Sequence, residues 1–79
     1  MRILKDFIIR GCKATLFDWN NRYLIKLEQG FLEQTYKISH HDVAGEDEVL
    51  KLLDDTFMDE VMARFSDMDR SLSETLQRV

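Results

Sequence analysis

The chain contains no proline, only three glycines and a single cysteine among its 79 residues. The lone Cys12 excludes an internal disulfide, and the N-terminal residues lack the pattern of an export signal, so we expect a cytoplasmic protein. No apolar run approaches the roughly 18 residues of a membrane span, so we expect no membrane segment. The isolated glycines exclude the Gly-rich loops that cradle nucleotide phosphates.

The two halves of the chain carry opposite net charge. Residues 1–41 have seven Lys or Arg against four acids, a net of +3, and residues 42–79 have four against eleven, a net of −7. The change of sign coincides with a change in the hydrophobic pattern from alternation to helical spacing. We therefore expect two structural parts that contact each other.

Three short runs alternate between apolar and polar residues and are rich in Thr, Ile, Tyr, Phe and Trp: 12–19, 22–28 and 31–38. This pattern predicts three β-strands. Asn20-Asn21 and Gln29-Gly30 separate them and suit hairpin turns, because Asn and Gly tolerate positive φ. The second turn also fits a longer, bulged loop.

Two-residue turns define a register for the predicted sheet. The first hairpin then pairs Leu16 with Ile25, and the second pairs Lys26 with Glu33 in a favourable charge pair. Asp18 and Gln34 are the only polar residues on the face that this register makes the core. The apolar members of that face are Cys12, Ala14, Leu16, Tyr23, Ile25, Leu27, Leu32, Tyr36 and Ile38.

The first ten residues fit two patterns. Ile3, Phe7 and Ile9 fit one face of a strand, and a helical stripe that includes Ile3 and Phe7 fits as well. Three isoleucines and the following Gly11 favour a strand that continues through a hairpin. The predicted fold is α+β, a three- to four-stranded antiparallel meander over 1–39 followed by one or two helices over 46–79, in a single domain.

Helical spacing begins at Glu46, where three acidic residues suit the first turn of a helix. Further along, seven apolar residues recur every three or four positions and form what we call the stripe: Met58, Val61, Phe65, Met68, Leu72, Leu76 and Val79. One helix through this region, a restart at Thr56 and a break near 69–71 all fit the pattern.

The residues that often carry chemistry are poorly placed for it. His40 and His41 are adjacent and would point in opposite directions, so we expect no metal site. Asp67 to Ser71 resembles the start of a calcium loop, but the Gly and Glu that such a loop needs are missing. Cys12 lies on the core face with no neighbouring base. We expect no cofactor and no enzymatic activity.

Two functional hypotheses remain. The predicted apolar surface exceeds what a 79-residue monomer is expected to bury, which favours a homodimer or a protein partner. The expected contact residues are Phe17, Trp19, Leu24, Phe31, Phe65, Met68 and Leu72. The alternative is single-stranded nucleic acid, stacked on rings and paired with cations on the outer face of the sheet. Its expected residues are Lys13, Phe17, Trp19, Arg22, Lys26, Phe31 and Lys37.

Overall fold

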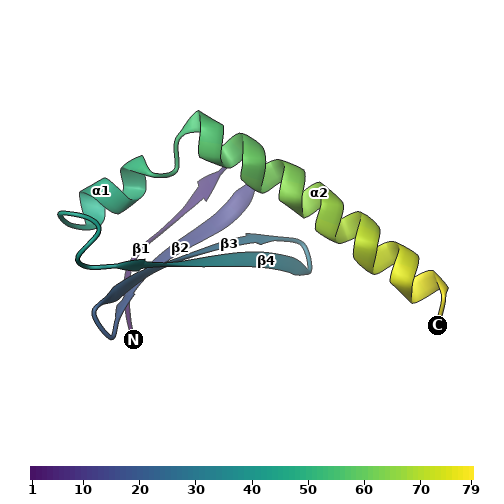
Figure 1. The fold of residues 1–79 in the computed structure, drawn as a ribbon, viewed down its shortest axis with the longest axis horizontal. Helices are drawn as coiled ribbons and strands as arrows, with labels where there is room; N and C mark the ends of the chain where they lie inside the picture. The colour runs from purple at the N-terminus through teal and green to yellow at the C-terminus, as the bar shows by residue number, and fades with distance from the viewer.

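The computed structural model describes all residues, 1–79, and shows four antiparallel strands in sequential order followed by two helices (Figure 1). The elements are β1 (Arg2–Ile9), β2 (Cys12–Trp19), β3 (Arg22–Gln29), β4 (Leu32–Ser39), α1 (Glu46–Lys51) and α2 (Asp55–Gln77). The predicted α+β meander is confirmed, and residues 2–9 form its first strand. Each hairpin turn is two residues long.

Backbone dihedrals explain the turns. Both residues of Arg10-Gly11 and of Asn20-Asn21 have positive φ, between 48° and 78°, as a type I′ hairpin turn requires. In the third turn, Gly30-Phe31, only Gly30 has positive φ, at 58°. A glycine in the first central position matches a type II′ turn. The predicted turn at Gln29-Gly30 is therefore wrong by one residue.

This difference changes the register of one hairpin and preserves its faces. Leu16 pairs with Ile25 as predicted. Lys26 pairs with Thr35, whereas the prediction paired it with Glu33. Moving the turn by one residue moves the pairing by two, so each side chain of β4 keeps its side of the sheet. The predicted Lys26–Glu33 pair is therefore absent from the ladder.

A β-bulge at the start of β1 redirects one side chain. The register of β1 against β2 shifts between Ile3 and Lys5, with Leu4 as the extra residue. Ile3 consequently lies on the outer face and is 61% exposed, while Phe7 and Ile9 pack against the core. The prediction that these three residues share one face is wrong for Ile3.

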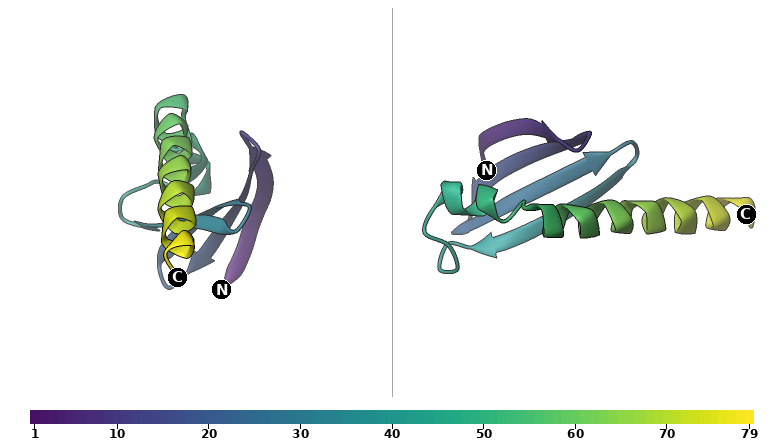
Figure 2. Two further views of the ribbon diagram at one scale, coloured as in Figure 1. Left: turned by 90° about the vertical axis from the view of Figure 1, so that its right-hand side faces the viewer. Right: turned by 90° about the horizontal axis from the view of Figure 1, so that it is seen from above.

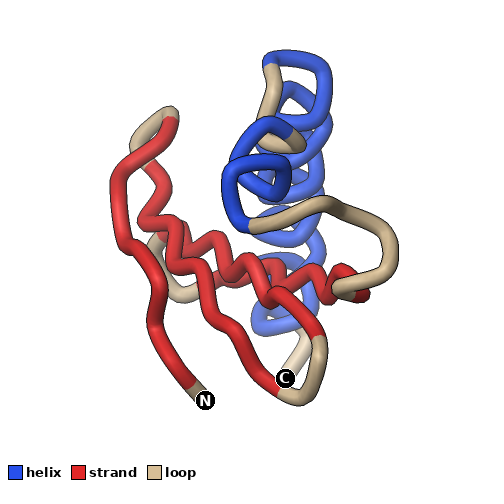
Figure 3. The backbone as a smooth tube through the Cα atoms, turned by 90° about the vertical axis from the view of Figure 1, so that its left-hand side faces the viewer, coloured by secondary structure: helices blue, strands red, loops and turns tan.

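Both helices lie on one side of the sheet, as Figures 2 and 3 show. The core forms between them and the strands, and its side chains come from β2, β3, α1 and α2. The fully enclosed members are Cys12, Ala14, Leu16, Ile25, Leu27, Val49, Met58, Val61 and Phe65. The opposite, outer face of the sheet carries no helix.

The helical part divides near residue 53. The carboxylate of Asp54 accepts a hydrogen bond from the backbone N–H of Phe57 at 2.9 Å, so Asp54, and not Thr56, caps α2. From there α2 runs for 23 residues without interruption, and the break considered near 69–71 does not occur. At 1.5 Å per residue this helix is about 34 Å long.

Charged residues join the basic and acidic parts of the chain. Arg10, in the β1–β2 turn, forms ion pairs with Asp59 and, at 3.1 Å, with Asp55 in the first turns of α2. Hydrogen bonds to Asp59 and then Asp55 raise the pKa of the Arg10 guanidinium. The expected contact between the two parts is therefore present, and it anchors the start of α2 to the sheet.

Candidate functional site

The C-terminal part of α2 extends past the end of the sheet (Figures 1 and 2). Every residue from 69 to 79 is exposed. The radius of gyration is 14.1 Å, whereas a compact chain of this length has one of about 11.6 Å. We call residues 68–79 the arm. Residues 68–77 of the arm are helical, and beyond Met68, which packs against the core, no residue of the arm is buried.

The arm continues the apolar stripe beyond the core. Met68 is half-buried, whereas Leu72 is 45% exposed, Leu76 is 63% exposed and Val79 is fully exposed. The same stripe buries Phe65 and Met58 against the sheet, about two and four helical turns before Leu72. A contiguous apolar stripe on an uncovered helix is typical of an interaction surface.

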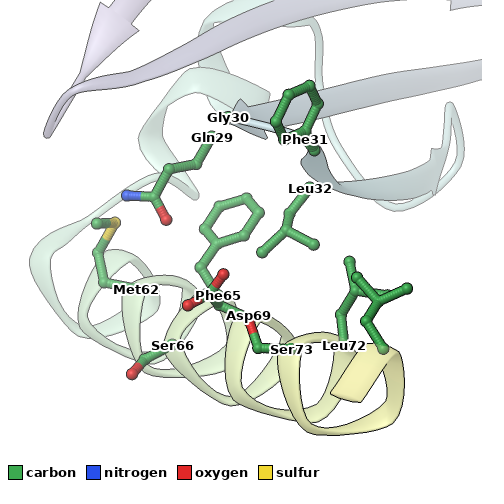
Figure 4. A pocket seen from close by; sticks show the side chains of 11 residues that line it. Gln29, Gly30, Phe31, Leu32, Met62, Phe65, Ser66, Asp69, Leu72 and Ser73 are labelled. Carbon is green, nitrogen blue, oxygen red and sulfur yellow. The ribbon is translucent and has the colours of Figure 1, made fainter. Parts of the chain in front are cut away.

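A groove of about 580 Å³ lies between the arm and the β3–β4 turn. In Figure 4, Leu32 from the start of β4 and Phe65 from α2 point into the space between the two elements. Phe31, at the tip of the turn, is fully exposed. The complete lining is Gln29, Gly30, Phe31, Leu32, Met62, Phe65, Ser66, Asp69, Leu72, Ser73 and Leu76. The groove and the arm thus form one continuous apolar surface.

Two of the predicted contact residues are buried within the chain. Phe65 is 1% exposed and belongs to the core, and its ring forms the bottom of the groove. Leu24 is 7% exposed because its in-register neighbours Phe17 and Lys37 flank it. The single chain therefore leaves five of the expected contact residues partly or fully exposed: Phe17, Trp19, Phe31, Met68 and Leu72. Alternation assigned Leu24 to the correct face but gave no measure of how far its neighbours cover it.

The outer face of the sheet brings only some of the predicted nucleic-acid residues together. Phe17 is half-buried, with Lys26 Nζ 5.8 Å from its ring centroid, and Trp19 is 42% exposed. Phe31 lies in the turn at the other end of β3 from Trp19, roughly 26 Å away along an eight-residue strand. A continuous stacking path through all three aromatic residues is therefore absent.

Acidic side chains balance most of the cations on that face. Lys26 lies 3.6 Å from Glu28, and Glu28 faces Glu33 across the ladder. Four cations, Lys13, Arg22, Lys26 and Lys37, share the face with three acids, Asp6, Glu28 and Glu33. The resulting net charge of +1 gives little of the phosphate attraction that binding to single strands requires.

The histidines contact other groups of the chain. His40 Nε2 lies 2.9 Å from Asp18 Oδ1, and its ring packs on Tyr23 with centroids 4.4 Å apart. Arg2 also reaches Asp18, at 3.6 Å. Asp18, a polar residue on the core face, is thus partnered by elements from both ends of the meander. No three His, Cys, Asp or Glu side chains form a group that could hold a metal ion.

Cys12 lies in the core with no exposed surface, and its Sγ is 3.5 Å from the sulfur of Met62. Desolvation raises the pKa of the Cys12 thiol. Above pH of about 8.5, the unfolded chain releases this proton while the folded chain keeps it. The unfolded state then binds fewer protons, so the free energy of unfolding falls as the pH rises.

We therefore expect wild-type stability to decrease between about pH 8 and 9.5 relative to Cys12→Ala. Urea unfolding at several pH values measures this difference, with the pH 7 difference between the two proteins as the reference. A constant difference across the range would contradict a role for the thiol.

No protein-family model, no curated protein and no solved structure matches this chain. No helix in the structure combines the length and the apolar character that crossing a membrane requires. The assignment of a function therefore depends on the surfaces described above.

Proposed function

We propose that this chain is a protein-interaction module that binds another protein chain through the arm and the groove. The observation that carries this proposal is the stripe itself, which leaves the core and continues along an uncovered helix. Keeping such surface in water costs about 25 cal/mol for each Å² of apolar area, and association recovers that free energy. The free thiol of Cys12 is compatible with a cytoplasmic location, which we retain as part of the proposal.

The shape of the surface favours a helical partner. An amphipathic helix binds by placing apolar side chains at helical spacing into a groove. The groove here runs beside a helix that already has such spacing, and Leu32 and Leu72 lie on its two sides. The outer face of the sheet supports the nucleic-acid alternative less well, because its aromatic residues are separated and its charges are nearly balanced.

Photo-crosslinking at the groove tests the proposal. We expect a chain with p-benzoylphenylalanine in place of Phe31, a fully exposed side chain, to form a covalent protein adduct when expressed in its host. The double substitution Leu72→Asp and Leu76→Asp should abolish the adduct, because it places charge on the stripe. Mass spectrometry of the adduct identifies the partner.

The matched control places the crosslinker at Ile8, which is 70% exposed on the outer face of the sheet. We expect this position to yield little adduct. Equal adducts at both positions, or an adduct at Phe31 that survives the arm substitutions, would argue against the proposed surface. Circular dichroism confirms that each variant is folded.

A further inference from the structure

We propose that the partner of the arm is the arm of a second copy, packed antiparallel about a two-fold axis at Leu72. This inference rests on the proposed function and names its partner. Each arm would then cover the stripe of the other, and the end of each arm would enter the groove of the other copy. The result is an isologous dimer in which the same patch contacts itself.

The spacing of the stripe is symmetric about Leu72. Met68 and Leu76 lie four residues to either side of it, and Phe65 and Val79 lie seven residues to either side. A two-fold axis at Leu72 therefore places Leu76 of one copy level with Met68 of the other, and Val79 level with Phe65. Phe65 is buried beneath the groove that it lines, so Val79 of the second copy enters the groove above it, and Met68, Leu72 and Leu76 each meet an apolar side chain of the second copy.

The position of the sheet excludes a parallel pair. The sheet occupies the stripe side of α2 at its N-terminal end, where it buries Met58 and Val61. Two parallel helices joined along the stripe would bring both sheets to the same end and into the same space. An antiparallel pair places the sheets at opposite ends, with the arms, each about 18 Å long, between them.

Arg70 and Glu74 lie on the side of the arm away from the stripe, whereas Asp69, three residues before Leu72, lies roughly 60° from it and lines the groove. Arg70 and Glu74 are each two residues from Leu72, so they lie roughly 200° around the helix from it. Within one chain Arg70 already forms ion pairs with Asp67 at 2.7 Å and with Glu74 at 3.6 Å. Association along the stripe therefore leaves these three paired charges in water and avoids the cost of burying them.

Small residues flank the stripe. Ser71, Ser73 and Thr75 lie beside Leu72 and Leu76 on the exposed arm. Short uncharged side chains in these places allow a second helix axis to approach to the usual 8–10 Å. Apart from Asp69, the arm thus has a narrow apolar centre between small polar edges, which suits a helix of the same kind.

Light scattering across concentrations from about 10 μM to 1 mM tests the dimer. We expect the mass to rise from 9.4 kDa toward twice that value. Leu72→Glu should raise the dissociation constant by more than about tenfold, because symmetry places both altered side chains at the axis. Gln77→Glu adds the same charge on the opposite side of the helix and should leave the dissociation constant unchanged.

Engineered cysteines test the register. Leu72→Cys should crosslink to itself with a short bifunctional thiol reagent. Met68→Cys and Leu76→Cys should each crosslink poorly alone and efficiently when the two variants are mixed, since an antiparallel pair brings these positions together. Buried Cys12 stays unreactive in all samples.

Several results would overturn the inference. A mass of 9.4 kDa at every concentration would exclude the dimer, while an adduct to a different protein at Phe31 would leave the proposed function intact. Efficient self-crosslinking of Met68→Cys would show a parallel arrangement. A dimer unaffected by Leu72→Glu would place the interface elsewhere on the surface.

Discussion

Replacing Phe65 by alanine is expected to lower the free energy of unfolding by about 3–5 kcal/mol. The ring is 1% exposed and is the largest fully buried side chain of the core. Removing it leaves a cavity between α2 and the sheet that a small domain has few means to fill. A protein of 79 residues has a total stability on the order of 4–12 kcal/mol, so the variant is expected to be close to unfolding.

Urea unfolding followed by circular dichroism measures this loss, and two further variants complete the experiment. Phe65→Leu keeps part of the volume and should give a smaller loss that remains measurable if the alanine variant does not fold. Leu72→Ala, on the same stripe but 45% exposed, should change the stability of the dilute protein by less than about 0.5 kcal/mol. A similar loss for Phe65→Ala and Leu72→Ala would contradict the burial seen here.

Replacing Gln34 by leucine is expected to cost about 1–3 kcal/mol, although leucine is apolar and the site is in the core. Gln34 is 9% exposed, and its Nε2 donates a hydrogen bond to the backbone carbonyl of Val61 at 3.0 Å. Its Oε1 accepts one from the hydroxyl of Tyr36, which in turn accepts one from Arg64 at 3.0 Å. This chain of hydrogen bonds links β4 to α2.

The expected loss of stability in Gln34→Leu comes from lost hydrogen bonds, and a control variant separates this cause from changes in packing. Leucine leaves the Tyr36 hydroxyl without its acceptor and removes a donor from the Val61 carbonyl. Gln29→Leu changes an exposed glutamine at the end of β3 and should alter the urea midpoint little. An unchanged midpoint for Gln34→Leu would show that the hydrogen bonds contribute nothing net to stability.

The alternation of apolar and polar residues, together with the turn residues, was sufficient to predict the strands from the sequence. Each run alternates because one face of the sheet packs against helices and the other meets water, which gives side chains a period of two. The first predicted register was correct because Asn20-Asn21 has only one arrangement as a two-residue turn with both φ positive. The predicted register of the second hairpin was wrong because Gly30 can occupy either central position of a two-residue turn. In the structure Gly30 occupies the first central position, and Phe31, in the second, has a negative φ.

The alternation of apolar and polar residues predicted neither the bulge in β1 nor the burial of Leu24. The bulge inserts Leu4 between Ile3 and the rest of β1, so Ile3 lies on the opposite side of the sheet from Phe7, with which strict alternation predicted it to share a face. Leu24 lies on the outer face, yet Phe17 and Lys37 flank it in register. Both outcomes depend on neighbours from other strands.

The interaction surface shows the same division between local and tertiary causes. Helical spacing along the chain specified the stripe, because side chains three and four residues apart share one side of a helix. Nothing in that spacing indicates that Phe65 is buried and Leu72 is exposed. Only the docking of α2 on the sheet buried the first and left the second in water, because the helix extends beyond the sheet that it covers. Local periodicity sets which side of an element is apolar, and the lengths and positions of the packed elements set how much of that side the chain can bury.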